Sequence, residues 1–137
     1  MRKIALDIGT VRIGIATSDP MGIIASGYET FTRTKNTEND MKYISNLAKT
    51  KGCDTFILGL PLNMDGTEGE KVLEIREFAK ELSKHTDLSI VFQDERWSTV
   101  SAEKMLIKSD MRREKRKKVV DKVAATIILQ TYLDKIH

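Results

Sequence analysis

The first apolar segment of the chain carries an acidic residue near its middle. Residues 2–10 read RKIALDIGT, so Asp7 lies among side chains typical of a buried strand. A buried carboxylate is costly unless it is paired or binds a cation, and Asp7 therefore requires partners from elsewhere in the chain. The alternative is an acid that ends the strand and hydrogen-bonds the following turn, for which Gly9 is suited.

Length and composition predict one globular domain spanning residues 1–137. Hydrophobic residues make up 40% and charged residues 31% of the chain, which is the balance of a soluble protein. No apolar run is long enough to cross a bilayer, and Asp7 interrupts the run nearest the N-terminus, which argues against a signal peptide. The single cysteine, Cys53, cannot form an internal disulfide, so we expect a reducing, cytoplasmic setting without membrane association.

Hydrophobic periodicity predicts the element order β-β-β-α-β-α-β-α-α. The short connection through Gly9 favours an antiparallel hairpin at the start, because a parallel partner would need a crossover. After the first strand, the expected strands are 12–18, 23–32, 55–58 and 88–93; the expected helices run from a cap at Thr37 to Gly52, over 72–82, after Ser98 or Thr99, and over 119–136. This order predicts an α/β fold: a mixed central sheet, antiparallel in its first strands and then parallel, with helices on both faces.

Two later stretches offer acidic partners for Asp7. The pair Asp94-Glu95 directly follows the strand over 88–93, and Asp121 lies on the last helix, one turn before Ala124 and Ala125. Sites in open α/β sheets gather at the carboxyl ends of the strands, and small alanines let the helix approach the sheet closely. The alternative for Asp121 is an acid in the first turn of its helix, where it complements the helix dipole.

Clustered carboxylates repel one another unless cations hold them together. Mg²⁺ and similar hard ions bind a few carboxylates together with water and substrate phosphate, and two such ions support phosphodiester hydrolysis. The only histidines are His85 and the terminal His137, so neither a zinc site nor a Ser-His-Asp hydrolase is supported. We therefore expect a nuclease site of Asp7, Glu95 and Asp121 that uses Mg²⁺ or Mn²⁺.

A basic run precedes Asp121. Six basic residues and one acid, Glu114, lie between Met111 and Lys118, whereas the whole chain has a net charge of only +3. Such a local patch is typical of a surface that binds a polyanion, and its alternative is a solvated loop. The residues that we expect to contact a phosphate backbone are Arg112, Arg113, Arg116, Lys117 and Lys118.

Four blocks of the sequence carry a resemblance to a known family. They are LDIGTVRIGIATSD (6–19), LGLPLNMDGTEG (58–69), DERWSTVSAE (94–103) and VDKVAATIILQTYL (120–133), in the family's order. The chain resembles the YqgF family, also called RuvX, within the ribonuclease H-like superfamily that includes the RuvC Holliday-junction resolvases. The resemblance implies a ribonuclease H-like fold and a nuclease that processes the 5′ end of pre-16S rRNA in ribosome biogenesis. Its acidic positions fall on Asp7, Glu95 and Asp121, with Asp94 left open as the alternative to Glu95.

Further residues beside these acids are candidates for substrate contact. Thr10 and Arg12 could offer a hydroxyl and a guanidinium to a phosphate. Asn63 lies in a loop of turn-forming residues, and Arg96 either contacts substrate or pairs with a neighbouring acid. Trp97 stands where the family usually has a smaller aliphatic residue, and it either packs in the core or stacks on unpaired bases.

Three other functions remain open from the sequence. A junction resolvase acting on branched DNA would need a stable dimer, whereas nothing in the sequence indicates more than a monomer or a weak homodimer. A non-catalytic RNA-binding assembly factor could dispense with the acids. The segment Asp7-Ile8-Gly9-Thr10 also resembles the phosphate loop of actin-like ATPases and sugar kinases, but 137 residues are too few for their two domains.

Overall fold

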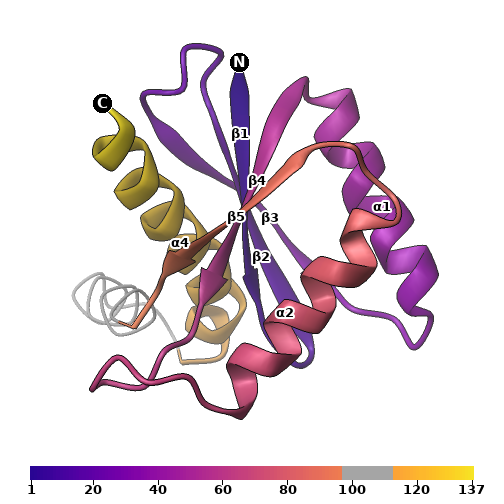
Figure 1. Ribbon diagram of the computed structural model, residues 1–137, viewed down its shortest axis with the longest axis vertical. Helices are drawn as coiled ribbons and strands as arrows, with labels where there is room; N and C mark the ends of the chain where they lie inside the picture. Colours follow the sequence, from indigo (N-terminus) through magenta and orange to yellow (C-terminus); the bar gives the residue numbers. More distant parts are fainter. Residues whose placement is uncertain (97–112) are drawn as a thin grey trace.

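A five-stranded mixed sheet forms the centre of the molecule (Figure 1). The computed structural model describes residues 1–96 and 113–137, and the side chains of residues 113–118 are not described. The elements are β1 (Arg2–Ile8), β2 (Arg12–Ser18), β3 (Ala25–Thr32), α1 (Thr37–Thr50), β4 (Cys53–Leu60), α2 (Glu70–Ser83), β5 (Ser89–Asp94) and α4 (Arg113–Ile136).

The strand order β3-β2-β1-β4-β5 confirms the predicted mixed topology. β1 and β2 form the expected antiparallel hairpin, and β3 continues it. β4 pairs in parallel with β1, and β5 pairs in parallel with β4, through crossovers that contain α1 and α2. The carboxyl ends of β1, β4 and β5 therefore lie at one edge of the sheet.

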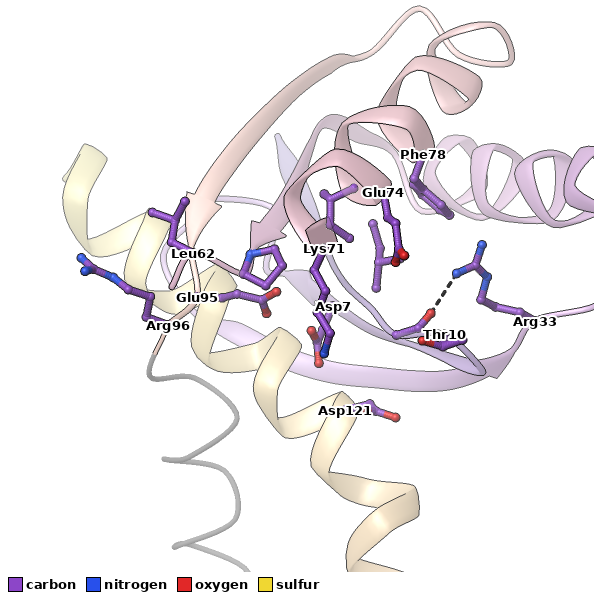
Figure 2. Close-up of a pocket in the computed structure, with 14 residues that line it drawn as sticks. Asp7, Thr10, Arg33, Leu62, Lys71, Glu74, Phe78, Glu95, Arg96 and Asp121 are labelled. Carbon is purple, nitrogen blue, oxygen red and sulfur yellow. Dashed lines mark hydrogen bonds between the residues drawn. The ribbon is translucent and has the colours of Figure 1, made fainter. Parts of the chain in front are cut away.

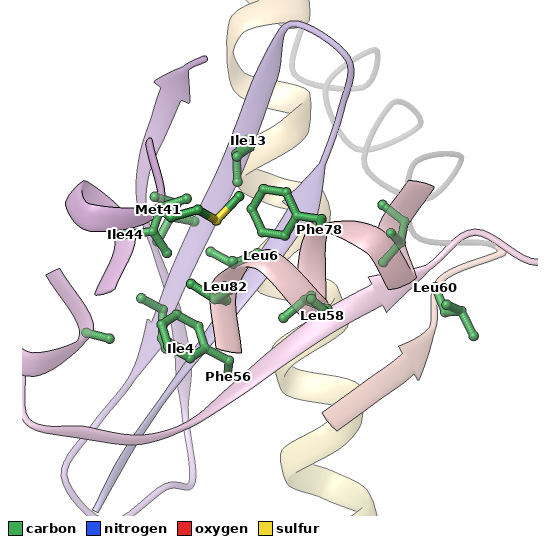
Figure 3. Packing of buried hydrophobic residues seen from close by; sticks show 14 of the residues in the cluster. Ile4, Leu6, Ile13, Met41, Ile44, Phe56, Leu58, Leu60, Phe78 and Leu82 are labelled. Atoms are coloured by element: carbon green, nitrogen blue, oxygen red, sulfur yellow. The ribbon is translucent and has the colours of Figure 1, made fainter. Parts of the chain in front are cut away.

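Helices cover both faces of the sheet, as the sequence predicts. On one face α1 and α2 pack against alternate strand residues, and Figure 3 shows their buried side chains around Leu6 and Phe56. Because successive strand residues point to opposite faces, Ala5 and Ile57 face α4 instead. Burial of these two apolar layers fixes which side of each strand faces which helix.

Close approach of α4 depends on a glycine as well as on its own alanines. A Cβ at Gly14 of β2 would come within 1.9 Å of the Asp121 carbonyl oxygen, which belongs to the helix backbone. Ala124 and Ala125 are buried, in agreement with the sequence argument. The missing side chain at Gly14 thus lets the backbone around Asp121 lie directly on the sheet.

Two boundaries differ from the prediction because side chains satisfy local backbone groups. Helix α1 is capped by Asn36, whose side chain accepts a hydrogen bond from the Asn39 N–H at 3.0 Å, and not by Thr37. Strand β3 begins at Ala25 rather than at residue 23, since the Asp19 carboxylate accepts hydrogen bonds from the N–H groups of Ile23 and Ile24.

Helix α4 begins earlier than the sequence suggested. The backbone is helical from Arg113, so the expectation of a basic loop up to residue 118 is wrong for 113–118. Arginine, lysine and glutamate are good helix formers, and no glycine or proline interrupts the run. Asp121 therefore lies in the third turn of α4, which excludes its interpretation as a first-turn acid.

Some expectations lie outside the described residues, namely the short helix after Ser98 or Thr99, Trp97 and Arg112. Among the helices that the structure does describe, none combines the length and the apolar character needed to cross a membrane.

Candidate active site

The three predicted acids line one cavity at the carboxyl edge of the sheet (Figure 2). The cavity has a volume of about 450 Å³. Asp7 comes from the end of β1, Glu95 follows β5, and Asp121 comes from α4. Segments that are far apart in the sequence thus contribute a carboxylate each to the lining of one cavity.

Asp7 and Glu95 are in direct contact. Their side chains share a hydrogen bond, and Glu95 is buried with 8% of its surface exposed. Burial, more than any other cause, raises the pKa of Asp7 to about 6 and that of Glu95 to about 9. For Glu95 the negative charge of Asp7 adds to the effect of burial, so Glu95 is the acid that retains the shared proton at neutral pH.

One oxygen of this pair has no partner. Oε2 of Glu95 is buried and accepts no hydrogen bond from any residue that the structure describes. The oxygen lies against β4, where a Cβ at Gly59 would come within 2.7 Å of it. Room for the Glu95 carboxylate therefore depends on glycine at position 59.

Asp94 points away from this pair. Its carboxylate forms an ion pair with Arg96 at 2.9 Å, and its side chain is 36% exposed. Partial burial raises the pKa of Asp94, but hydrogen bonds from the backbone and side chain of Arg96 outweigh burial and lower the pKa overall. The structure thus separates the two adjacent acids: Glu95 contacts Asp7, and Asp94 holds Arg96.

Asp121 lies at the rim and is engaged by Arg12. Nε of Arg12 donates a hydrogen bond to Oδ2 of Asp121 at 3.2 Å. Although Asp121 lines the same cavity and its negative charge raises the pKa of Asp7, the described residues contain no three acidic, histidine or cysteine side chains close enough to form a complete metal site. The site as it stands is a buried carboxyl pair with a third acid nearby.

The other predicted contact residues have separate positions. Thr10 lines the cavity, and Arg12 does not, because it reaches across to Asp121. Asn63 does not line the cavity, and its side-chain amide donates a hydrogen bond to the Thr67 hydroxyl within the same loop at 2.9 Å. Arg96 lines the cavity edge and also donates to the Met64 carbonyl at 3.1 Å, so it ties this loop to the end of β5.

Sequence reasoning missed the wall of the cavity that α2 and the end of β3 supply. Lys71, Glu74 and Phe78 follow one another at helical spacing along α2, and Arg33 faces them. Nη1 of Arg33 donates to the Gly9 carbonyl at 2.8 Å and so supports the turn after Asp7. Lys71 could have indicated this wall of the cavity, because a lysine in the first turn of a helix opposes the helix dipole and therefore calls for a functional explanation.

Comparisons with known proteins identify the family of this chain. The profile of the RuvX family, described as Holliday junction resolvase, matches residues 1–135. A relative from Syntrophomonas wolfei, named "Putative pre-16S rRNA nuclease", is 46% identical over 134 residues, covering 98% of this chain and 94% of the relative. A relative of the same name from Halalkalibacterium halodurans is 46% identical over 136 residues, covering 98% of this chain and 97% of the relative.

A solved structure supports the fold. RuvC from T. thermophilus, in complex with a Holliday junction substrate, matches with a TM-score of 0.59 at 7% identity, over 99% of this chain and 96% of RuvC. At this identity the likeness concerns the fold alone, and it confirms the expected ribonuclease H-like architecture. The chain therefore belongs to the RuvX family, and its enzyme class is that of a nuclease.

Proposed function

We propose that this nuclease is metal-dependent, that Asp7 and Glu95 hold Mg²⁺ or Mn²⁺, and that its substrate is the precursor of 16S rRNA. The observation that carries the proposal is the buried contact between Asp7 and Glu95. Two carboxyl groups with raised pKa values and one unpartnered buried oxygen are an unfavourable arrangement that a divalent cation would relieve.

The donor set suits a hard cation. Carboxylate oxygens are the ligands that Mg²⁺ prefers, and Mg²⁺ usually keeps several waters and binds substrate phosphate as well. Asp121 is the third candidate ligand, because it lines the cavity and is only partly exposed. Bound there, such a cation supplies charge stabilisation and an activated water for phosphodiester hydrolysis.

The chain's own residues prepare the site for this chemistry. Glu95 carries the proton of the carboxyl pair at neutral pH and has to release it before it can act as a full carboxylate ligand. Arg12 holds Asp121 at the rim, and Arg96 fixes the loop that contains Asn63. Thr10 lines the cavity, and its hydroxyl would donate a hydrogen bond to a phosphate oxygen there.

The substrate proposal rests on the relatives that are named as pre-16S rRNA nucleases. We propose cleavage at the 5′ end of this precursor in the bacterial cytoplasm. The basic residues at the start of α4 would guide the RNA backbone toward the acids, and they are Arg113, Arg116, Lys117 and Lys118, with Arg112 immediately before them.

A cleavage assay with matched substrates tests the proposal. The purified protein is incubated with a 16S rRNA precursor fragment, a four-way DNA junction and an unrelated single-stranded RNA, with Mg²⁺, Mn²⁺ or EDTA. We expect metal-dependent cutting of the precursor, and its loss in Asp7→Asn. Cutting of the junction alone would contradict the RNA substrate, and cutting that persists in EDTA would contradict the metal site.

A further inference from the structure

Among the residues that the structure describes, three cationic side chains line the cavity, and two of them already have partners. Arg33 donates to the Gly9 carbonyl and lies 5.6 Å from the centre of the Phe78 ring. Arg96 is held by Asp94 and by the loop carbonyl of Met64. Both guanidinium groups therefore contribute to the walls of the cavity.

Lys71 is the third cation, and it has no such partner. Among the residues that the structure describes, Lys71 forms neither an ion pair nor a side-chain hydrogen bond. Its side chain is directed from α2 toward Asp7, as Figure 2 shows. Its positive charge acts on both members of the carboxyl pair, since it lowers the pKa of Asp7 and that of Glu95.

Helix stability does not account for a lysine at this position. Lys71 is the second residue of α2, where acidic residues are favoured and a cation opposes the helix dipole. The N-cap, Gly69, provides no side-chain hydrogen bond to the first turn. The first turn of α2 thus presents to the cavity an ammonium group that has no ion-pair or hydrogen-bond partner among the described residues.

We propose that Lys71 binds a non-bridging oxygen of the substrate phosphodiester in this cavity. The proposal deepens the nuclease function proposed above and shares its site. An anion bound between the first turn of α2 and the carboxyl pair would contact Lys71. Among the described residues that line the cavity, Lys71 is the one cation without an ion-pair or hydrogen-bond partner. The ammonium donates hydrogen bonds and takes no part in bond making or breaking, so its contribution is to position the phosphate and stabilise its charge.

Three variants test this assignment: Lys71→Met removes the charge, Lys71→Arg keeps it, and Lys80→Met removes an exposed lysine further along the same helix. The first readout needs no catalysis: the affinity for the precursor fragment is measured in EDTA at several salt concentrations. We expect Lys71→Met to reduce the slope of log affinity against log salt by about 0.7, the value for one lost contact to a single strand. Lys80→Met is expected to keep the slope of the unmodified protein.

The second readout is cleavage at saturating Mn²⁺. We expect Lys71→Met to lower kcat by about 100-fold, as for the loss of one preorganised charge donor, and Lys71→Arg to retain most of the activity. An unchanged slope and kcat in Lys71→Met would overturn the assignment. Tighter Mn²⁺ binding in Lys71→Met with an unchanged slope would also overturn it, because Lys71 would then be only a counter-ion for the acids. If the unmodified protein cuts nothing, the nuclease proposal fails, while the slope still decides whether Lys71 contacts phosphate.

Discussion

Asp7 and Glu95 share a hydrogen bond between two side chains that would both be negatively charged in water at neutral pH. The bond requires that one of them keep its proton, and burial together with the negative charge of Asp7 makes Glu95 the one that does. Because the two groups interact strongly, the two pKa values describe successive loss of protons from the pair. A buried contact between two acids is unfavourable for stability, and the pair is therefore the candidate functional site.

The stability of the metal-free protein should fall as pH rises. The folded-state pKa values, about 6 for Asp7 and about 9 for Glu95, lie above the ordinary values of 3.8 and 4.5. Over this range the folded protein binds more protons than the unfolded chain, so deprotonation favours unfolding. We expect a loss on the order of 4 kcal/mol between about pH 5.5 and about pH 8.5 in EDTA, measured by urea unfolding.

A matched pair of variants isolates this contribution. Glu95→Gln keeps the size of the side chain and its hydrogen bond to Asp7 but cannot titrate, so its stability should depend less on pH. Asp87→Asn, at an exposed acid away from the cavity, should leave the pH dependence unchanged. Equal pH dependence in the Gln variant and the unmodified protein would contradict the raised pKa of Glu95.

Divalent cations should restore the stability that the metal-free protein loses as the pH rises. A ligand that binds only the folded state raises the free energy of unfolding by an amount that grows with its concentration. We expect Mn²⁺ to raise the melting temperature of the unmodified protein near neutral pH, with no comparable rise in Asp7→Asn. An equal rise in both proteins would place the metal elsewhere.

The adjacent acids should differ in their effect on cleavage. Glu95→Gln removes a group in contact with Asp7 and should lower activity by more than about 100-fold, the upper end of the effect of losing a residue that supports a metal ligand. Asp94→Asn only weakens the ion pair with Arg96 and should retain most of the activity. The opposite ranking would make Asp94 the functional acid and contradict the assignment of Glu95.

Gly59 should be intolerant of a side chain. A Cβ there would come within 2.7 Å of both Oε2 of Glu95 and Cδ1 of Ile128. We expect Gly59→Ala to cost about 1–3 kcal/mol in the free energy of unfolding, as overpacking generally does. The double variant Gly59→Ala with Glu95→Ala should lose less than the sum of the two single changes, and simple additivity would show that the two positions are not in contact.

The sequence predicted the sheet well because its strands and turns carry local signals. The Gly9 connection indicates the hairpin between the first two strands, which the structure confirms. The choice between Asp94 and Glu95 could not be made from sequence. Neighbouring residues at the end of a strand point in opposite directions, so a shift of one position reverses which acid faces the site.

Other features depend on contacts between distant segments. Gly14 acquires its role only because the backbone of Asp121 lies on it. Lys71 was overlooked because Asp7 and Glu95, the acids whose pKa values its charge lowers, come from other elements. For Gly14 and for Lys71 the decisive neighbour is far away along the chain.

The most direct test of the metal site is calorimetric titration of Mn²⁺ near neutral pH in two buffers that differ in ionisation enthalpy. Metal binding at the Asp7–Glu95 pair must displace the proton that Glu95 retains, so we predict binding with release of about one proton. Asp94→Asn should behave in the same way, and Glu95→Gln should lose both the binding and the proton release. Binding of undiminished strength in Glu95→Gln, or binding without proton release, would contradict the account.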